Sequence, residues 1–165
     1  MLVRTVYPEE MPHVGELRVR TYLDQGLLDP DSPYLPVLRA LGTSGIGDVL
    51  VAVDGDELLG TVTLRPFQED SEITLSPDEA EVRALAVAPH AQRRGIGRLL
   101  LRSVIERARN AGVAHLVLST QPIMVAAQRL YASEGFVRLP ERDWSPQPGV
   151  PLLAYGLRLS ARGQE

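Results

Sequence analysis

Hydrophobic and polar positions along this chain repeat with two periods, one typical of strands and one typical of helices. Apolar runs bounded by turn-forming residues predict seven strands, at Leu2–Val6, Val49–Val53, Leu58–Leu64, Val82–Val87, Val113–Ser119, Phe136–Leu139 and Leu152–Leu159. Segments with helical spacing or helix-start signals predict four helices, at Pro8–Asp24, Tyr34–Leu41, Arg93–Asn110 and Ile123–Glu134. The predicted order is thus one strand, two helices, three strands, a helix, a strand, a helix and two strands.

The order of these elements indicates how the sheet is connected. Asp54-Gly55-Asp56 predicts a hairpin turn, so the strands on either side of it should be antiparallel. The strand, helix and strand between Val82 and Ser119 predict a parallel crossover. The sequence thus predicts an α/β (α+β) fold with a mixed sheet.

Two connections have distinctive compositions. Between Glu69 and Glu81 the chain has six acidic residues and no basic one, which is typical of a solvated connection. Gly135 predicts a left-handed end to the last helix, with Phe136 folding back onto Leu130 or Tyr131.

Length and composition limit the classes of function. With 165 residues, 44% of them hydrophobic, we expect one domain over residues 1–160 and a loose tail over 161–165. A net charge of −4 argues against nucleic acid as a partner. The chain has no apolar run near the ~18 residues of a membrane span and no leader pattern, so we expect a cytoplasmic protein without a membrane partner.

Residue types that are missing exclude several mechanisms. The chain has no cysteine, and all 17 of its basic Lys and Arg positions are arginine. A thiolate nucleophile, a cysteine-rich metal site and a lysine Schiff base are therefore excluded. His13, His90 and His115 are isolated in the sequence, and we expect surface or turn positions and no metal site.

The segment from Val87 to Leu99 carries the clearest chemical signal. It predicts a strand that turns into a helix whose first turn holds glycines and arginines. Glycine inside a helix costs roughly 0.5–1 kcal/mol relative to alanine, and cations are disfavoured at the positive end of the helix dipole. An anion such as a pyrophosphate would explain both features. The alternative interpretation is a tight turn followed by a solvated basic face.

Two common phosphate-binding motifs do not fit this segment. A Walker loop needs a lysine after its glycines, and this chain contains none. The dinucleotide fingerprint needs a third glycine where Leu100 stands.

Three stretches together resemble the GNAT acetyltransferase superfamily: Glu81-Val82-Arg83-Ala84-Leu85-Ala86-Val87, Gln92-Arg93-Arg94-Gly95-Ile96-Gly97, and Ala127-Gln128-Arg129-Leu130-Tyr131-Ala132-Ser133-Glu134-Gly135-Phe136. The resemblance implies a mostly antiparallel seven-stranded sheet with a parallel pair at a central splay and about four helices. It also implies acetyl-CoA as co-substrate and no metal. By resemblance, the pantetheine arm pairs with the backbone of Leu85, Ala86 and Val87. The pyrophosphate is then held by Gln92, Arg93, Arg94, Gly95, Ile96, Gly97 and Arg98.

The resemblance also suggests two catalytic residues. Glu81 lies eleven residues before Gln92, the spacing of the catalytic glutamate in the histone-acetyltransferase branch, and is the candidate base. The strand from Glu81 to Val87 spans roughly 20 Å at about 3.3 Å per residue, comparable to an extended pantetheine. The alternative for Glu81 is a strand-end carboxylate of the acidic connection. Tyr131 resembles the family's acid for the leaving thiolate, and its alternative is a core aromatic residue. Many relatives have asparagine where this chain has Met124.

The resulting hypothesis is an N-acetyltransferase that moves an acetyl group from acetyl-CoA to a primary amine of a small molecule or peptide in a ternary complex. The alternative is a non-catalytic acyl-CoA-binding or regulatory module.

The acidic connection either attracts a cationic amine or is merely solvated. Trp144 either lines the acceptor site or anchors its loop. The acceptor, the acyl chain and the oligomeric state, a homodimer among the options, stay open.

Overall fold

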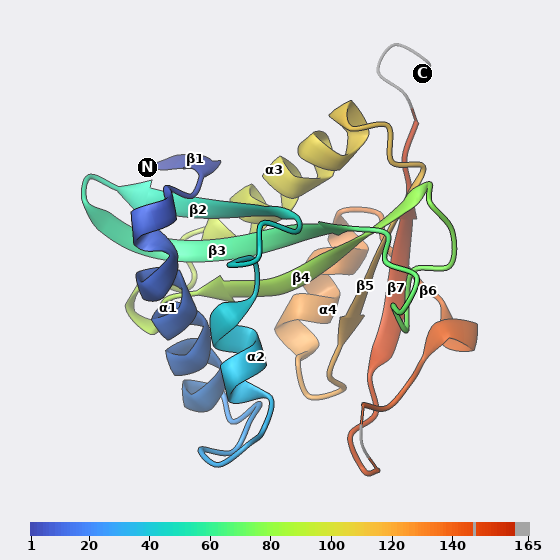
Figure 1. Cartoon of the computed structure of the whole chain (residues 1–165), viewed down its shortest axis with the longest axis horizontal. Helices are drawn as coiled ribbons and strands as arrows, with labels where there is room; N and C mark the ends of the chain where they lie inside the picture. The colour runs from blue at the N-terminus through green and yellow to red at the C-terminus, as the bar shows by residue number, and fades with distance from the viewer. Residues whose placement is uncertain (147, 161–165) are drawn as a thin grey trace. The chain divides into compact units, whose positions relative to one another are not determined.

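The computed structural model describes residues 1–146 and 148–160 (Figure 1). The strands are β1 (Leu2–Thr5), β2 (Asp48–Asp54), β3 (Glu57–Pro66), β4 (Glu79–Val87), β5 (His115–Thr120), β6 (Val137–Arg138) and β7 (Leu153–Arg158). The α-helices are α1 (Met11–Asp24), α2 (Leu35–Ala40), α3 (Ile96–Asn110) and α4 (Val125–Ser133). Short 3-10 helices are η1 (Pro8–Glu10), η2 (Pro89–Ala91) and η3 (Pro140–Arg142). The tail expected at 161–165 lies outside the described residues.

The strands form one seven-stranded sheet in the order β1-β2-β3-β4-β5-β7-β6. β4 and β5 are parallel, whereas β1 with β2, β2 with β3, β5 with β7 and β6 with β7 are antiparallel. This confirms the predicted mixed, mostly antiparallel sheet with one parallel pair, and the described part of the chain has the four expected α-helices.

The chain forms two compact units, each built from two stretches of sequence. The first unit comprises Met1–Leu64 and Ala84–Val104, and the second comprises Arg65–Arg83 and Ile105–Glu165. β4 and α3 each contribute residues to both units. A single domain over 1–160 stays a prediction.

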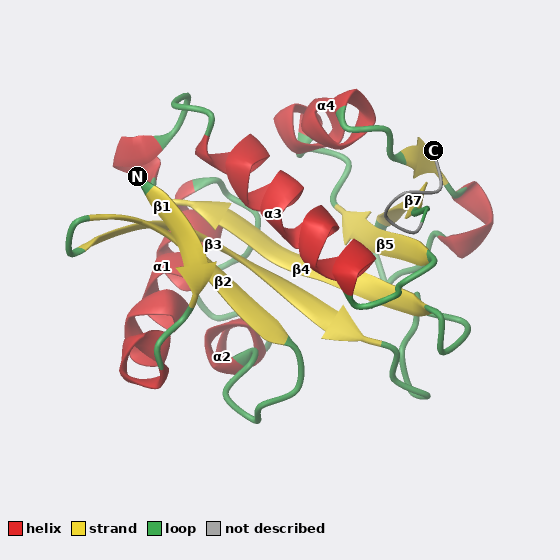
Figure 2. Cartoon of the chain, turned by 90° about the horizontal axis from the view of Figure 1, so that it is seen from above, coloured by secondary structure: helices red, strands yellow, loops and turns green. Residues whose placement is uncertain are grey.

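In the first unit, helices cover both faces of the strands. Alternate residues of β2, Val49, Val51 and Val53, pack against Val14 of α1. α1 and α2 lie on that face, and the beginning of α3 lies on the opposite one (Figure 2). On the face covered by α3, β3 has Gly60, where a Cβ atom would lie 2.9 Å from Leu100 Cδ1 of α3. A small residue is therefore needed for α3 to approach the sheet.

A fully buried arginine ties these layers together. Arg18 of α1 is 0% exposed. Its Nη1 atom donates hydrogen bonds to the carbonyl oxygens of Leu38 and Leu41 at 3.2 and 2.7 Å. Its Nη2 atom donates to Thr63 Oγ1 of β3 at 3.1 Å. One side chain thus joins α1, the α2 region and β3.

The second unit is built around β5, which pairs with β7 along its whole length from His115↔Arg158 to Thr120↔Leu153. α4 ends as the sequence predicts. The amides of Gly135 and Phe136 donate to the carbonyls of Ala132 and Tyr131, and Gly135 has a φ of 97°. The Tyr131 and Phe136 rings lie 5.8 Å apart, which confirms that Phe136 folds back.

Two of the predicted boundaries that were wrong bear on the candidate site. β4 begins at Glu79 rather than Val82, because Glu79 is already paired with His115 in the parallel ladder. α3 begins at Ile96 rather than Arg93, because Arg93 and Gly95 have φ values of 66° and 79° and cannot be part of a right-handed helix.

Candidate functional site

The candidate phosphate segment lies in the first unit, between the end of β4 and the first turn of α3. It is fixed at its start, where the Ala88 amide donates to the Leu59 carbonyl of β3 at 2.8 Å. It is fixed at its end by Ile96, which is 1% exposed. Between these anchors, Gln92, Arg93, Arg94 and Gly95 are all exposed. The sequence therefore holds both ends of this loop and leaves its middle to solvent.

The backbone of this loop is unusual. Arg93 and Ala84 are the non-glycine residues with a positive φ in the described chain, and Gly95 adds a second left-handed residue only two positions after Arg93. A Cβ atom on Gly95 would meet no other protein atom within 4 Å. Gly95 is therefore needed for its φ and not to relieve internal crowding. Because it precedes the helix, the expected cost of a glycine within the helix applies only to Gly97.

These features fit an anion. The first amides of an α-helix have no acceptor within the helix, and turns with left-handed residues point successive amides into a common concavity. The Gly95 carbonyl accepts the Leu99 amide at 3.1 Å, so the amides of Ile96, Gly97 and Arg98 form the first turn. Guanidinium groups bind phosphate oxygens with paired hydrogen bonds. The chemistry of this donor set matches a pyrophosphate.

The end of β4, which adjoins the phosphate segment, is the predicted contact for pantetheine. Ala86 is buried, and Leu85 and Val87 are partly buried. The Gln92 Nε2 atom donates to the Val87 carbonyl at 3.2 Å, which links this strand end to the phosphate segment. Ala84, just before Leu85, has a φ of 54°, a strained value for a residue with a side chain. The pairing of pantetheine with this strand end stays a prediction.

Glu81 lies on the part of β4 that belongs to the second unit. Its side chain is 13% exposed, and its Oε2 atom lies 3.9 Å from the Nε atom of Arg83. Burial raises the pKa of the Glu81 carboxyl, and the positive charges of Arg83 and Arg65 oppose this shift without cancelling it. A carboxyl with a raised pKa accepts a proton more readily than an ordinary glutamate.

Tyr131 lies near the C-terminal end of α4 in the same unit and is 5% exposed. Its ring packs against Phe136 and, at 6.2 Å between centroids, against Tyr155 of β7. The Tyr155 hydroxyl donates to Gln128 Oε1 at 3.2 Å. Tyr131 therefore has the packing of a core aromatic residue, and its role as an acid stays a prediction. At the start of α4, the Met124 Sδ atom accepts a hydrogen bond from Thr120 Oγ1 at 3.4 Å.

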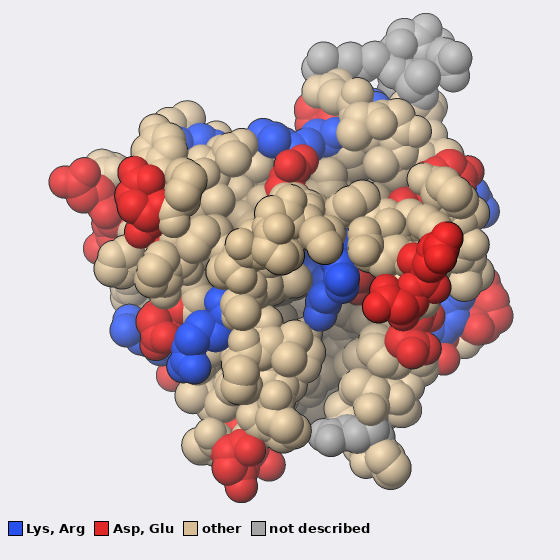
Figure 3. All heavy atoms as spheres, viewed as in Figure 1, with Lys and Arg blue, Asp and Glu red and all other residues tan. Residues whose placement is uncertain are grey.

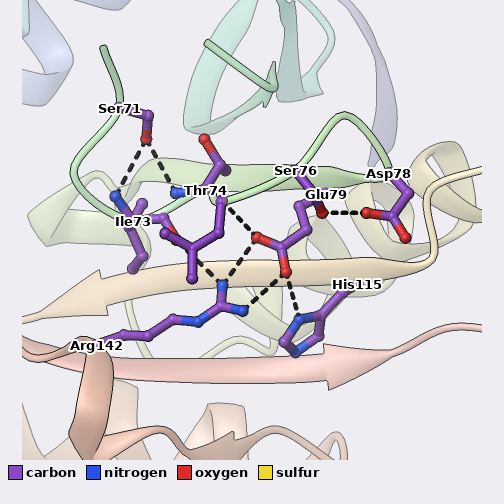
Figure 4. A network of polar contacts seen from close by, with 9 residues as sticks. Ser71, Ile73, Thr74, Ser76, Asp78, Glu79, His115 and Arg142 are labelled. Atoms are coloured by element: carbon purple, nitrogen blue, oxygen red, sulfur yellow. Dashed lines mark hydrogen bonds and ion pairs between the residues drawn. The ribbon is translucent and has the colours of Figure 1, made fainter. Parts of the chain in front are cut away.

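The sequence analysis missed a buried polar network in the second unit (Figure 4). Glu79 is 5% exposed, so its place in a solvated connection was wrong. Its two carboxylate oxygens accept hydrogen bonds from Arg142 Nη1 and Nη2 at 2.8 and 2.9 Å. The Leu75 amide donates to Oε1 at 2.8 Å, and His115 Nδ1 lies 3.0 Å from Oε2.

The environment of Glu79 determines its charge. Burial alone raises the pKa of its carboxyl, but hydrogen bonds from Arg142, Leu75 and His115 outweigh burial and lower the pKa to about 2. An ionised carboxylate can only accept hydrogen bonds, so His115 donates from Nδ1. His115 is 3% exposed, and its expected surface position was therefore wrong. A Cβ atom on Gly156 of β7 would lie 2.5 Å from His115 Nε2, so glycine makes room for this ring.

The remaining candidates are less enclosed. Glu69, Asp70, Glu72 and Asp78 are exposed as expected, and Figure 3 shows red acidic side chains gathered over the loop between β3 and β4. Trp144 donates from Nε1 to Ser119 Oγ of β5 at 2.9 Å, so its indole anchors the loop. In the described part of the chain, no group of three or more His, Asp or Glu side chains could hold a metal ion. None of its helices is long and apolar enough to cross a membrane.

Comparison with known proteins gives a consistent result. The model of the acetyltransferase (GNAT) family matches residues 14–136. An amino-acid acetyltransferase of Neisseria meningitidis is 29% identical over 84% of this chain, and the match covers 29% of that protein. A ribosomal protein bS18-alanine N-acetyltransferase of Salmonella typhimurium is 44% identical over 36% of this chain and 40% of its own. The chain thus corresponds to less than half of either relative.

A solved structure shows the same fold. The protein yncA of Salmonella typhimurium, determined with its cofactor acetyl-CoA, superposes with a TM-score of 0.70. The superposition covers 100% of this chain and 97% of that one at 21% sequence identity. At this identity the likeness concerns the fold alone.

Proposed function

Because the chain belongs to the acetyltransferase (GNAT) family, we propose that it is an N-acetyltransferase that transfers the acetyl group of acetyl-CoA to a primary amine. The observation that carries the proposal is the segment from Gln92 to Arg98. It combines two left-handed residues, open space beside Gly95 and exposed arginines at the first turn of α3. A loop with this backbone and these side chains is suited to bind a pyrophosphate group.

Each part of the chain has a distinct task in the proposed reaction. Acetyl-CoA, when bound, supplies a thioester whose carbonyl carbon an amine can attack. The amides of Ile96, Gly97 and Arg98, together with the arginine side chains, bind and orient the pyrophosphate. The backbone of Leu85–Val87 orients the pantetheine arm.

The remaining residues move protons. An acceptor amine is mostly an ammonium ion at neutral pH and must lose a proton before it attacks. Glu81 accepts that proton, directly or through a water molecule, and its raised pKa supports this role. As the new C–N bond forms and the C–S bond breaks, the attacking nitrogen loses its second proton to solvent and the Tyr131 hydroxyl donates a proton to the departing sulfur. Solvent then returns a proton to Tyr131. The acetylated amine and CoA are the products.

A Gly97→Val substitution tests the cofactor site. The valine side chain would block close approach to the first turn of α3, so we expect CoA affinity to fall at least tenfold in calorimetric titration. Ala126→Val, at an exposed position of α4, adds the same bulk to another helix and should leave affinity unchanged. Unchanged affinity in a folded Gly97→Val protein contradicts the assignment.

Turnover separates the enzyme from a non-catalytic acyl-CoA-binding module. The wild-type protein is incubated with acetyl-CoA and a panel of amines, and CoA release is measured. Because the chain has no lysine, acetylation of its own lysine side chains cannot contribute to this signal. Acetyl-CoA binding without turnover of any amine would favour the module.

A further inference from the structure

Gly60 lies in the interior of β3 and is buried. Glycine weakens a strand interior, because it packs no side chain, and it is typical of a place where another part of the chain comes close. Gly60 is not among the described glycines with a positive φ, so its backbone conformation is open to other residues. The missing side chain, rather than an unusual backbone, is therefore what matters at this position.

A side chain at position 60 would meet two parts of the candidate cofactor site. A Cβ atom would lie 2.9 Å from the carbonyl oxygen of Ala86, on the strand end predicted to contact pantetheine. It would also lie 2.9 Å from Leu100 Cδ1 and 3.3 Å from Ile96 Cγ2 of α3. Ile96 is the first residue of α3 and directly follows the exposed part of the phosphate segment. One position of β3 thus adjoins both the predicted pantetheine strand and the helix of the phosphate segment.

The preceding residue of β3 holds the other end of the same segment. The Leu59 carbonyl accepts the Ala88 amide at 2.8 Å, just after β4 ends. Leu59 and Gly60 therefore contact the two ends of the loop, Ala88 and Ile96, from adjacent positions of one strand. Because the middle of the loop is exposed, packing against β3 determines where the first turn of α3 lies.

The atoms around Gly60 have little room to move. Ile96 is 1% exposed and Leu100 is 0% exposed. Protein interiors are packed as densely as organic crystals, so an added methyl group forces its neighbours to shift. Leu100 relieves part of the overlap by a change of rotamer, but the Ala86 carbonyl is backbone and moves only with β4. An alanine at position 60 would therefore displace the end of β4, the start of α3 or both.

We propose that Gly60 is a positioning residue for the co-substrate, and that the affinity for acetyl-CoA depends on the absence of a side chain at this position. This inference rests on the proposed function. The amides of Ile96, Gly97 and Arg98 belong to one helical turn, so they move together when Ile96 moves. Hydrogen bonds weaken steeply as their geometry departs from the optimum. A pyrophosphate bound by several of these amides would therefore be sensitive to a small displacement of α3.

A glycine of the second unit provides a matched control. Gly156 is a buried residue of β7, where a Cβ atom would lie 2.5 Å from His115 Nε2 and 2.7 Å from Leu139 Cδ1. Like Gly60, it is not among the glycines with a positive φ. An alanine there crowds the interior at least as closely, but His115 and Leu139 are not predicted to bind the cofactor. Gly156→Ala therefore reproduces the overpacking without changing the candidate cofactor site.

The test measures CoA affinity by calorimetric titration and stability by denaturant unfolding in both variants. We expect both to lose stability. Only Gly60→Ala should bind CoA more weakly, by roughly tenfold, the loss of about one hydrogen bond to a charged group. With an amine that is turned over, this variant should have a raised KM for acetyl-CoA and an unchanged kcat, because only binding is lost. Wild-type CoA affinity in a folded Gly60→Ala protein overturns the inference, as does an equal loss of affinity in Gly156→Ala.

A second comparison applies if Gly60→Ala does not fold. Leu100→Ala removes one of the overlapping side chains, so the double variant Gly60→Ala/Leu100→Ala has more space and keeps the overlap with the Ala86 carbonyl. The double variant should bind CoA more weakly than Leu100→Ala alone, and equal affinities overturn the inference. If the wild-type protein binds no CoA, the proposed function itself fails.

Discussion

Glu79 and Glu81 lie two residues apart on β4, and their surroundings shift their pKa values in opposite directions. Glu79 is held by Arg142, Leu75 and His115, and its pKa falls to about 2. Glu81 has two arginines nearby, yet burial keeps its pKa above the ordinary value. Both carboxyls have arginines nearby, but Glu79 also accepts hydrogen bonds that favour its charged form, whereas burial dominates at Glu81.

The comparison also indicates different roles for Glu79 and Glu81. Glu79 is an anchor, because its hydrogen bonds join β4 to η3, to β5 and to the loop before β4. It has no remaining tendency to take up a proton near neutral pH. Glu81 is buried enough to be a better base than an ordinary glutamate and exposed enough to meet a substrate. We therefore propose that Glu79 stabilises the fold and that Glu81 transfers the proton.

The largest effect on stability is expected for Glu79→Gln. The substitution leaves the Arg142 guanidinium without its buried counter-charge, and breaking a buried ion pair costs about 3–5 kcal/mol. Denaturant unfolding should show this loss. Glu81→Gln is the matched control on the same strand and should change stability far less. Equal losses in the two variants would contradict the division of roles.

Lowering the pH should reveal the contribution of Glu79 to the free energy of unfolding without any mutation. The folded-state pKa of Glu79 is lowered to about 2 from an ordinary value of 4.5. Its stabilising effect is therefore complete above pH 4.5 and is lost as the pH falls towards 2. At about 1.4 kcal/mol per pKa unit, the loss amounts to roughly 3 kcal/mol. Unfolding free energies measured from pH 5 to pH 2 should fall by this amount more in the wild type than in Glu79→Gln.

A smaller effect, limited to catalysis, is expected for Tyr131→Phe. The ring contacts with Phe136 and Tyr155 are kept and only the hydroxyl is lost, so stability and CoA affinity should be preserved. Turnover should fall roughly 10²-fold, the lower range for a positioned general acid. Tyr155→Phe, which removes a hydroxyl bound to Gln128, is the control. If Tyr131→Phe retains wild-type turnover, Tyr131 is only a core residue.

Elements with a strong local signal could be predicted from the sequence. The periodicity of α3 and α4, the hairpin at Asp54-Gly55-Asp56 and the end of α4 at Gly135 all follow from residues close together in the chain. The start of α3 could not be placed because Arg93 has a positive φ without being glycine, and no local pattern announces that conformation.

The network around Glu79 could not be predicted for a different reason. It depends on the register that pairs Glu79 with His115 and on Arg142, which is 63 residues further along the chain. A shift of one residue in register would turn His115 to the other face of the sheet. The sequence spacing that indicated Glu81 could not predict the pKa of its carboxyl either, because that pKa depends on burial.

The central claim is that Glu81 is the base, and the pH dependence of kcat/KM tests it most directly. In the wild type, kcat/KM should rise with pH through a group whose pKa lies above 4.5, the ionisation of Glu81 in the free enzyme. Glu81→Gln should lose this rise and be roughly 10²- to 10⁴-fold slower. Glu79→Gln, measured where it is folded, should keep it. A Glu81→Gln enzyme with the rate and pH profile of the wild type from pH 6 to 9 would contradict the account.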